Sequence, residues 1–360
     1  MSACPPLLFE PILMPRVWGG RRLAERFGRR LPPDARVGES WELVSLPEAE
    51  SRVRGGPAAG RTPGDWLATI RTHPGGGAPL AEGRFPLLIK LLDARENLSI
   101  QVHPRPPREG AWAPGVKHEA WYVIEAERGA EAFIGLRPGV SSEEAARAAG
   151  TPRLVDLLQR WPARPGDCFY LPSGTPHALG SGLLVAEIES PSDVTYRMYD
   201  WDRTDDAGRS RQLHLEQAAA NVRDDVRPED ILQSRSHVAG VLTTTTRLVR
   251  CESFMIDRLR VMEGFAGIVP HAEMVIWMVL AGRARVERGA DALDVVPGDT
   301  LLLPARNEGI VLHALAELDL LEVRVPIAST LRGLPHPPRE APVSPGGVVP
   351  LNVRSKPSSG

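Results

Sequence analysis

The 360-residue sequence predicts a mainly β protein with two jelly-roll domains and a small helical segment. Three observations indicate this fold: short apolar runs rich in β-branched and aromatic residues, 35 prolines and 34 glycines that separate them, and an internal repeat. Clusters of proline and glycine mark turns and strand ends, so short strands between them are typical of sandwiches and barrels. The chain is long enough for two or three lobes with a sizeable core.

The repeat is a tight turn followed by a strand. Pro165-Gly-Asp-Cys-Phe-Tyr-Leu-Pro172 recurs as Pro297-Gly-Asp-Thr-Leu-Leu-Leu-Pro304. This pattern is typical of cupin domains, and its repetition predicts a tandem bicupin. We therefore expect a metal-binding catalytic cupin over residues 1–235, a degenerate cupin over 236–335, and a tail over 336–360 rich in Pro, Ser and Gly.

Helical patterns are confined to a few places. An insertion around residues 141–161 is expected to hold two short helices, the first beginning at the N-cap Ser141 and running to Ala149, the second from Arg153 to Trp161. Leu213–Ala220 and then Pro228–Leu232 are expected to form a helical bridge between the two halves.

Composition favours an enzyme of the cell interior. The 43 Lys and Arg against 45 Asp and Glu leave a net charge of −2, which gives no electrostatic case for binding nucleic acid or membranes. Cys4, Cys168 and Cys251 form no CxxC pattern, so we expect a reducing compartment without disulfides. The N-terminus lacks the features of a signal peptide, and no apolar run approaches the roughly 20 residues of a membrane span. The expected protein is cytoplasmic and monomeric.

Four side chains between residues 99 and 203 have the character of one metal site. Gln101 and His103 are two apart in a strand-like segment, so both point to one face of the strand, together with Ser99. Glu119 precedes the strand-like run that begins at Trp121, and His177 is expected in a tight turn after the strand over 167–172.

This set of donors indicates the class of metal. Two imidazoles, a carboxylate and an amide oxygen suit zinc or another borderline divalent metal, and the absence of thiolates argues against a structural zinc of the finger type. An open coordination position for water or substrate is expected. Taken singly, each residue also has an ordinary interpretation, because a His-Pro pair is often only a turn and a Glu before a strand is often only solvated.

These segments resemble the type I phosphomannose isomerases, in particular their short bacterial form, over about residues 8 to 330. The resemblance implies that Gln101, His103, Glu119 and His177 are the ligands of one zinc ion per chain. It continues through Glu187-Ile-Glu-Ser-Pro-Ser-Asp-Val-Thr-Tyr-Arg-Met-Tyr-Asp-Trp-Asp-Arg203, and through Arg16-Val-Trp-Gly-Gly20 and Gly38-Glu-Ser-Trp-Glu42 near the N-terminus. The segment after His103, Pro104-Arg-Pro-Pro-Arg-Glu-Gly110, is short and proline-rich and departs from the family pattern.

The resemblance implies a zinc-dependent aldose–ketose isomerase that interconverts mannose 6-phosphate and fructose 6-phosphate through a cis-enediol. Glu187 is the first candidate for the base. Asp193 is the second, with a buried structural carboxylate or a substrate contact as its other roles. Arg197 offers a positive charge for an oxyanion or for the phosphate.

The remaining predicted residues contact the sugar phosphate. Lys117 shares the face of Glu119 and either binds substrate oxygens or pairs with a ligand carboxylate, and Ser99 is expected near the phosphate. Trp18, Glu39 and Trp41 are expected to form the cavity wall.

Two other classes of protein were weighed. Iron dioxygenases of the cupin type carry a His-x-His pair on the first strand, whereas here Gln101 precedes His103. A non-catalytic sugar-binding cupin would be expected to lose Glu187 or Arg197, and both are present. A related sugar or sugar phosphate stays open as the substrate, as do the physiological metal, with cobalt and manganese as alternatives, and the catabolic or biosynthetic direction.

The second repeat is expected to be structural. Where the first repeat has His177, five residues after its proline, the second has Gly309. His271 and Glu273 precede an apolar strand and resemble ligands, but no partner histidine follows them at the matching place.

Overall fold

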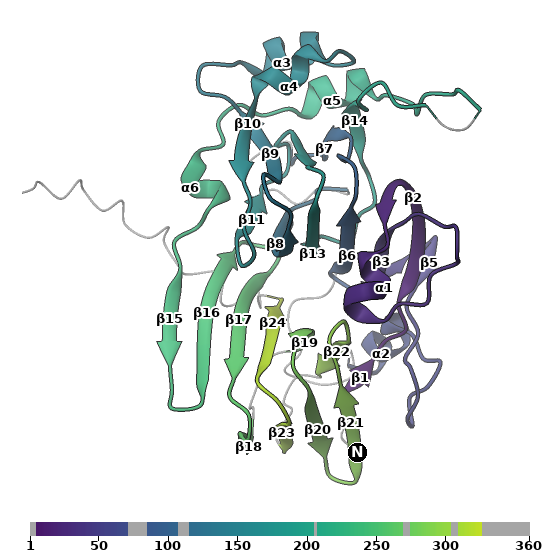
Figure 1. The fold of residues 1–360 in the computed structure, drawn as a ribbon, viewed down its shortest axis with the longest axis vertical. Helices are drawn as coiled ribbons and strands as arrows, with labels where there is room; N and C mark the ends of the chain where they lie inside the picture. The colour runs from purple at the N-terminus through teal and green to yellow at the C-terminus, as the bar shows by residue number, and fades with distance from the viewer. Residues whose placement is uncertain are drawn as a thin grey trace, which may run out of the picture.

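The structure is a computed structural model that describes residues 5–70, 85–106, 115–204, 207–268, 274–303 and 309–325. Figure 1 shows a β-rich molecule with helices at its upper end and along its sides. The strands of its first half are β1 (Leu7–Leu8), β2 (Ile12–Gly20), β3 (Val37–Leu43), β4 (Ser45–Leu46), β5 (Ala49–Glu50), β6 (Leu88–Ala94), β7 (Ile100–Val102), β8 (Glu119–Ala126), β9 (Glu131–Leu136), β10 (Leu158–Pro162), β11 (Cys168–Leu171), β12 (His177–Leu179), β13 (Leu183–Glu189) and β14 (Tyr196–Tyr199).

The second half is almost entirely strand. It contains β15 (Ser236–Ala239), β16 (Thr243–Arg250), β17 (Met255–Val261), β18 (Ala266–Ile268), β19 (Val275–Ala281), β20 (Ala284–Arg288), β21 (Asp291–Val295), β22 (Thr300–Leu303), β23 (Ile310–Ala314) and β24 (Leu318–Arg324). The helices are α1 (Arg22–Phe27), α2 (Pro63–Ile70), α3 (Ser142–Ala148), α4 (Arg153–Leu157), α5 (Leu215–Asn221) and α6 (Pro228–Ile231). The predicted mainly β fold is confirmed.

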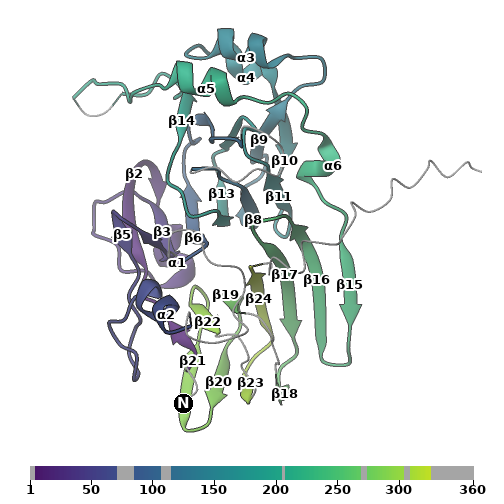
Figure 2. The same cartoon turned by 180° about the vertical axis from the view of Figure 1, so that it is seen from behind.

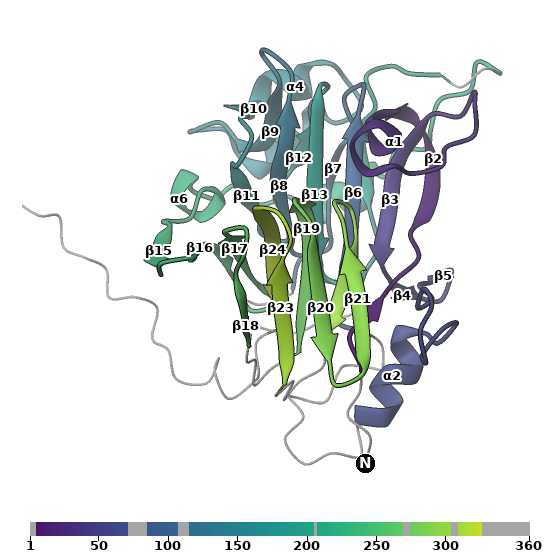
Figure 3. The ribbon, with the colours of Figure 1, turned by 60° about the horizontal axis from the view of Figure 1, so that its bottom comes forward.

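Four sheets carry the architecture. Their strand orders are β10-β9-β12-β7-β14, β11-β8-β13-β6-β2-β3, β1-β22-β19-β24-β17-β16-β15 and β18-β23-β20-β21. Separate apolar clusters fill the space between the first and second sheets, the second and third, and the third and fourth. Figure 3 shows the second and third sheets lying one behind the other.

The same strand order occurs twice in the chain. The eight consecutive strands β6 to β13, here called the first unit, pair as β11-β8-β13-β6 and β10-β9-β12-β7. The eight strands β17 to β24, the second unit, pair as β22-β19-β24-β17 and β21-β20-β23-β18. Strand by strand, the second unit repeats the topology of the first.

The repeated Pro-Gly-Asp turns have matching geometry. Asp167 accepts a hydrogen bond from the backbone N–H of Arg164 at 2.8 Å, and Asp299 accepts one from the N–H of Val296 at 3.0 Å. Gly166 and Gly298 have φ angles of 93° and 90°, which a side chain rarely tolerates. The sequence repeat therefore marks one local structure, the entry to β11 in one unit and to β22 in the other.

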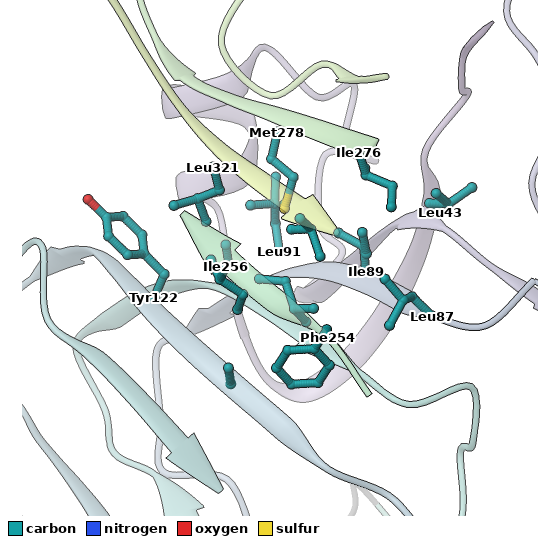
Figure 4. Packing of buried hydrophobic residues seen from close by; sticks show 14 of the residues in the cluster. Leu43, Leu87, Ile89, Leu91, Tyr122, Phe254, Ile256, Ile276, Met278 and Leu321 are labelled. Atoms are coloured by element: carbon teal, nitrogen blue, oxygen red, sulfur yellow. The ribbon is translucent and has the colours of Figure 1, made fainter. Parts of the chain in front are cut away.

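Successive side chains of a strand point to opposite faces of its sheet, so the two sets of side chains lie in different environments. On β6, Ile89 and Leu91 belong to the core between the second and third sheets, whereas Lys90 points to the opposite face. Figure 4 shows Ile89 and Leu91 packed beside Ile256 and Met278 of the second unit. Burying each such side chain contributes about 1.5–3 kcal/mol. The two units are thus joined back to back by apolar side chains.

Helices cover the outer face of the five-stranded sheet. Figure 2 shows α3, α4 and α5 beside β9, β10 and β14, and their buried residues share one apolar cluster with that sheet. Ser141 caps α3 by accepting from the N–H of Glu144 at 3.2 Å. The expected second helix is shorter than predicted, because residues 158–162 pair with β9 as strand β10, with Leu158 opposite Leu136.

The N-terminal segment contributes to two sheets. Leu7 and Leu8 of β1 pair with Leu302 and Leu301 of β22, and β2 and β3 extend the six-stranded sheet beside β6. The N-terminal residues therefore add a strand to a sheet of the second unit. A single boundary in the sequence does not separate the strands of the two halves. Within the described residues, no helix is both long and apolar enough to cross a bilayer.

Some predictions fall on residues that the structure does not describe. His271, Glu273, Cys4 and the tail over 336–360 lie outside the described ranges. Cys168 and Cys251 are free thiols.

Candidate metal centre and cavity

Two histidines and a glutamate meet inside the first unit. His177 Nε2 lies 3.2 Å from Glu119 Oε2, and His103 Nε2 lies 3.0 Å from Glu119 Oε1. Ligand atoms of the three side chains lie within 4.8 Å of one another, and all three residues are buried. Three strand ends position them, because His103 follows β7, Glu119 opens β8 and His177 opens β12.

The backbone sets the tautomer of both imidazoles. His103 Nδ1 is 2.8 Å from the carbonyl oxygen of Val194, and His177 Nδ1 is 2.8 Å from that of Thr175. A carbonyl only accepts, so each Nδ1 carries the proton and each Nε2 presents a lone pair toward Glu119. Burial lowers the pKa of His103 to about 4, which keeps that imidazole neutral. A neutral ring oriented by a carbonyl is the usual state of a histidine that binds a metal.

Gln101 completes the set across the strand pair. It lies opposite His177 in the β7–β12 register, and its Nε2 is 3.3 Å from His177 Nε2. The two amide atoms are interchangeable by a half turn, which would direct Oε1 at the same point. His103 Nε2 and Glu119 Oε2 are buried without a hydrogen-bond partner. Buried polar atoms without partners are rare, and these are oriented as ligand atoms, so the residues fit a divalent cation.

A chain of buried ion pairs continues from Glu119. Lys117 Nζ lies 2.9 Å from Glu119 Oε1 and 2.7 Å from Glu189 Oε2. Lys90 Nζ lies 2.6 Å from Glu189 Oε1 and 3.3 Å from Glu187 Oε2. Glu119, Glu187 and Glu189 together also satisfy the spacing of a metal site. The two ammonium groups occupy the space between these carboxylates, so we interpret the three glutamates as an ion-pair network.

The network controls the charge of its members. Burial alone would raise the pKa of Glu119, but the charge of Lys117 opposes this effect, and the pKa lies well below the usual range. Burial raises the pKa of Glu187, an effect that Lys90 opposes. Burial would lower the pKa of Lys117, yet Glu119 and Glu189 keep it raised. The metal-side carboxylate is therefore ionised, whereas Glu187 is shifted toward the protonated form.

One cavity of about 330 Å³ opens onto this network. That volume is within the range of about 300–1,000 Å³ typical of small-molecule sites. The predicted residues among its walls are Trp18, Glu39, Ser99, Gln101, Lys117, Glu119, Glu187, Asp193 and Arg197. Elements far apart in the sequence therefore meet here, from β2 and β3 to the start of β14.

Three predicted residues are placed differently from expectation. Trp41 does not line the cavity, because it is fully buried behind Glu39 and donates from Nε1 to Glu39 Oε2 at 2.6 Å. Asp193 is exposed at the cavity wall, so its interpretation as a buried structural carboxylate is wrong. His177 lies in a short strand paired with β7 and β9, whereas a tight turn was expected.

Sequence reasoning missed four further polar residues of the cavity wall. These are Arg16, Lys90, Thr195 and Arg211. Lys90 carried a usable signal, since a lone charge inside the apolar run 85–92 is seldom buried without a partner. Arg16 forms a two-pronged ion pair with Glu39, at 2.7 and 3.0 Å, which only the β2–β3 pairing reveals.

The far wall of the cavity is cationic. Arg197 donates from one terminal nitrogen to the carbonyl of Gln212 at 2.7 Å, and its Nε is buried without a hydrogen-bond partner. Burial lowers the pKa of Arg197, and the neighbouring Arg211 adds to that effect. Arg211 itself pairs with Asp200. This wall is suited to an anionic group of a ligand.

These features define a class: a β-sandwich protein with a histidine–carboxylate metal site at the base of a polar cavity. The family profile described as phosphomannose isomerase type I, catalytic domain, matches residues 8–133. Mannose-6-phosphate isomerase ManA of Bacillus subtilis is 35% identical over 302 residues, 83% of this chain and 93% of that protein. The mannose-6-phosphate isomerase of Streptococcus mutans is 35% identical over 306 residues, 83% of this chain and 92% of that protein. The chain belongs to the type I phosphomannose isomerase family.

Solved structures agree with this assignment. The crystal structure of the mannose 6-phosphate isomerase from Bacillus subtilis matches with a TM-score of 0.78 at 30% identity, covering 89% of this chain and 99% of that one. The apo form of the Salmonella typhimurium enzyme matches with a TM-score of 0.67 at 17% identity, covering 90% of this chain and all of that one, which supports the fold alone.

Proposed function

We propose that this chain is a zinc-dependent aldose–ketose isomerase that interconverts mannose 6-phosphate and fructose 6-phosphate through a cis-enediol. The observation that supports it best is one cavity lined by Glu119 of the metal-type cluster, by a buried carboxylate with a raised pKa, and by an arginine with an unpaired nitrogen. Family membership supports the same activity, since the curated relatives carry that name.

Gln101, His103, Glu119 and His177 would hold the zinc ion. When bound, zinc supplies Lewis-acid polarisation of the carbonyl and hydroxyl oxygens of the sugar. The donor set also suits cobalt or manganese, so the physiological metal is a separate question. The orphaned atoms of His103 and Glu119 support a cation at this point.

We assign the proton transfer at carbon to Glu187. In the direction from aldose to ketose, its carboxylate takes the proton from C2 and returns it to C1, while the hydroxyl proton of O2 is transferred to O1. Trp121 Nε1 donates to Glu187 Oε1 at 2.8 Å and orients the group. Its raised pKa suits a residue that both accepts and returns a proton, because efficient proton transfer needs a pKa near the working pH.

Lys117 and Arg197 would stabilise negative charge. Lys117 has three N–H donors, and the two that reach Glu119 and Glu189 leave one for a substrate oxygen. We propose that Arg197, with Arg211 and Ser99, binds the phosphate, and that Asp193 binds a sugar hydroxyl. Trp18 and Glu39 form the wall nearest β2 and β3, where Arg16 fixes the Glu39 carboxylate.

We also propose that the two units are cupin domains, the catalytic one within residues 1–235 and the degenerate one within 236–335. The identical strand order of the two units and the matching turns support this division. The monomeric state, the cytoplasmic location and the absence of a nucleic-acid partner stay predictions.

The test is a coupled isomerase assay with mannose 6-phosphate, before and after treatment with a chelator, and again with zinc added back. Turnover should disappear with the chelator and return with zinc. Glu187→Gln should bind zinc but lose turnover. Its matched control is Glu322→Gln, because Glu322 accepts from Trp277 in the second unit as Glu187 does from Trp121. Full activity in Glu187→Gln would remove the base role, and no turnover by the zinc-loaded protein would favour another sugar or a binding protein.

A further inference from the structure

We propose that His118 is a positioning residue that couples the second unit to the metal-binding segment of the first. It stands between Lys117 and Glu119, and its side chain is 10% exposed. Its two neighbours line the cavity, whereas His118 does not. In an extended chain, successive side chains point to opposite sides. The side chain of His118 therefore points away from the cavity, toward the second unit. The inference rests on the proposed metal site and goes beyond it by assigning a role to a residue that is not a ligand.

Three contacts hold the imidazole of His118. Its Nδ1 accepts from the backbone N–H of Ser173 at 3.3 Å and lies 2.8 Å from the hydroxyl of Tyr170. Its Nε2 lies 3.0 Å from Glu252 Oε1. A backbone N–H can only donate, so Nδ1 is the acceptor and the ring proton is on Nε2, from which it is donated to Glu252. All hydrogen-bonding capacity of the ring is used.

The contacts come from two separate parts of the chain. Tyr170 is on β11, and Ser173 lies in the segment that leads to His177. Glu252 lies in the turn that leads from β16 into β17, the first strand of the second unit, and both strands belong to the seven-stranded sheet. Glu252 is half exposed, and its contact with His118 holds its pKa below the usual range. The second unit therefore contributes a charged acceptor directly behind the metal-binding segment.

The backbone around His118 is held from both sides. Ser173 Oγ accepts from the N–H of Lys117 at 3.0 Å and donates to the carbonyl of the same residue at 2.7 Å. Ser190 accepts from the N–H of His118 at 3.1 Å through its hydroxyl, and its own N–H donates to the His118 carbonyl at 2.9 Å. These backbone hydrogen bonds and the three contacts of the imidazole together form a frame that holds the segment from Lys117 to Glu119.

This frame links two of the proposed ligands. Glu119 follows His118 directly, and Ser173 precedes His177 by four residues in a segment that His118 also contacts. A metal site loses affinity when its ligands are held loosely, because they must be placed to within about 0.5 Å. Removing the His118 contacts should therefore loosen Glu119 and His177 together.

Two substitutions of His118 separate its contacts. His118→Asn retains an acceptor near the position of Nδ1 and loses the contact with Glu252. His118→Gln retains a donor near the position of Nε2 and loses the contacts with Tyr170 and Ser173. Glu252→Ala removes only the contact between Glu252 and His118. The matched control is Glu263→Ala, because Glu263 is an exposed glutamate on the next turn of the same unit.

The measurement is the zinc affinity of the full chain, by competition with a chromophoric chelator, alongside thermal unfolding of the metal-free protein. We expect His118→Asn and His118→Gln to weaken zinc binding by about 10-fold, at the low end of the effect of contacts behind a metal site. Glu252→Ala should have a smaller effect of about 3-fold, because Glu252 contacts the imidazole and is itself half exposed. Glu263→Ala should bind zinc as the wild type does. At saturating zinc the variants should regain most of kcat, with KM for mannose 6-phosphate unchanged.

Each possible result of these zinc-binding and unfolding measurements leads to a different conclusion. Wild-type zinc affinity in both His118 variants, with only a lower unfolding temperature, would mean that the residue merely fills space and would overturn the inference. Wild-type affinity in Glu252→Ala would overturn the coupling to the second unit. If the His118 variants do not fold, the comparison of Glu252→Ala with Glu263→Ala decides the question. A wild-type chain that binds no zinc would overturn the proposed metal site itself, a result that is independent of the variants.

Discussion

The two units share a framework but fill their interiors differently. Each has a tryptophan that donates to a glutamate on the neighbouring strand: Trp121 to Glu187 at 2.8 Å in the first unit and Trp277 to Glu322 at 3.0 Å in the second. In both units these residues are direct partners in the strand register. The pair is therefore part of the repeated framework and is not by itself a mark of catalysis.

The difference lies two residues before each tryptophan. Glu119 occupies that place in the first unit and Val275 in the second, where Val275 packs with Leu301 and Leu312 in an apolar cluster. The partner of the glutamate also changes, because Lys90 lies opposite Glu187 whereas Asp257 lies opposite Glu322. Similar sheets thus enclose a charged cavity in one unit and a packed core in the other, which illustrates that function resides in side chains placed on a fold.

The largest expected difference between the units concerns their histidines. His177→Ala should weaken zinc binding by more than about 100-fold, because contacts behind a ligand already account for about 10–100-fold. Turnover of mannose 6-phosphate should fall with it. His313→Ala, on the equivalent strand β23, should change neither, since that side chain is 36% exposed and only pairs with Glu287 at the surface. Zinc stoichiometry by elemental analysis checks both, and full zinc content in His177→Ala would contradict the proposed ligand.

Placing a carboxylate in the second unit should destabilise it. Val275→Glu would bury an acid among apolar side chains, at a cost of about 3–5 kcal/mol, because its strand partner Arg324 is already paired with Asp257. Burial would raise its pKa in the folded state. The unfolded state would then release its proton first, so the free energy of unfolding should fall as pH rises from about 5 to about 8. Denaturant unfolding at both pH values measures this, and a variant as stable as the wild type would show that the interior is less tightly packed.

Removing the tryptophan donor should lower stability to a similar extent in both units but should lower activity only in the first unit. Trp121→Phe and Trp277→Phe each remove a donor to a buried carboxylate, which is worth about 1.5–3 kcal/mol. Only Trp121→Phe should also lower kcat, because Trp121 orients Glu187. Unfolding curves and steady-state kinetics on both variants make the comparison. A lower kcat in Trp277→Phe would indicate that the second unit affects the chemistry by another route.

The smallest effects are expected in the repeated turns. Asp167→Ala removes the acceptor of the Arg164 N–H and should cost about 0.5–1.5 kcal/mol. Asp299→Ala should cost more, because Asp299 also pairs with Arg54 of the N-terminal segment at 3.0 Å. Thermal unfolding of the two variants measures the difference. Equal losses would mean that the pair with Arg54 contributes nothing to stability.

Much of the framework could be predicted from local sequence. The Pro-Gly-Asp turns need glycine at a positive φ and a carboxylate to accept from the turn, so their repetition alone revealed the two units. Helix α3 was predictable from the cap Ser141 and the alanines after it. The end of α4 was not, because Leu158 to Pro162 become a strand only when β9 is available to pair with them.

The candidate site also combines features that are local in the sequence with features that depend on the tertiary structure. Gln101 lies on β7 and His103 directly follows that strand, and their spacing of two residues is a local property that the sequence by itself determined. The residues that set charge and position, such as Lys90, Glu189 and Glu252, come from segments far apart in the sequence. Only the tertiary structure decided their roles, because an ion pair depends on distances that the pairing of strands and the packing of sheets impose.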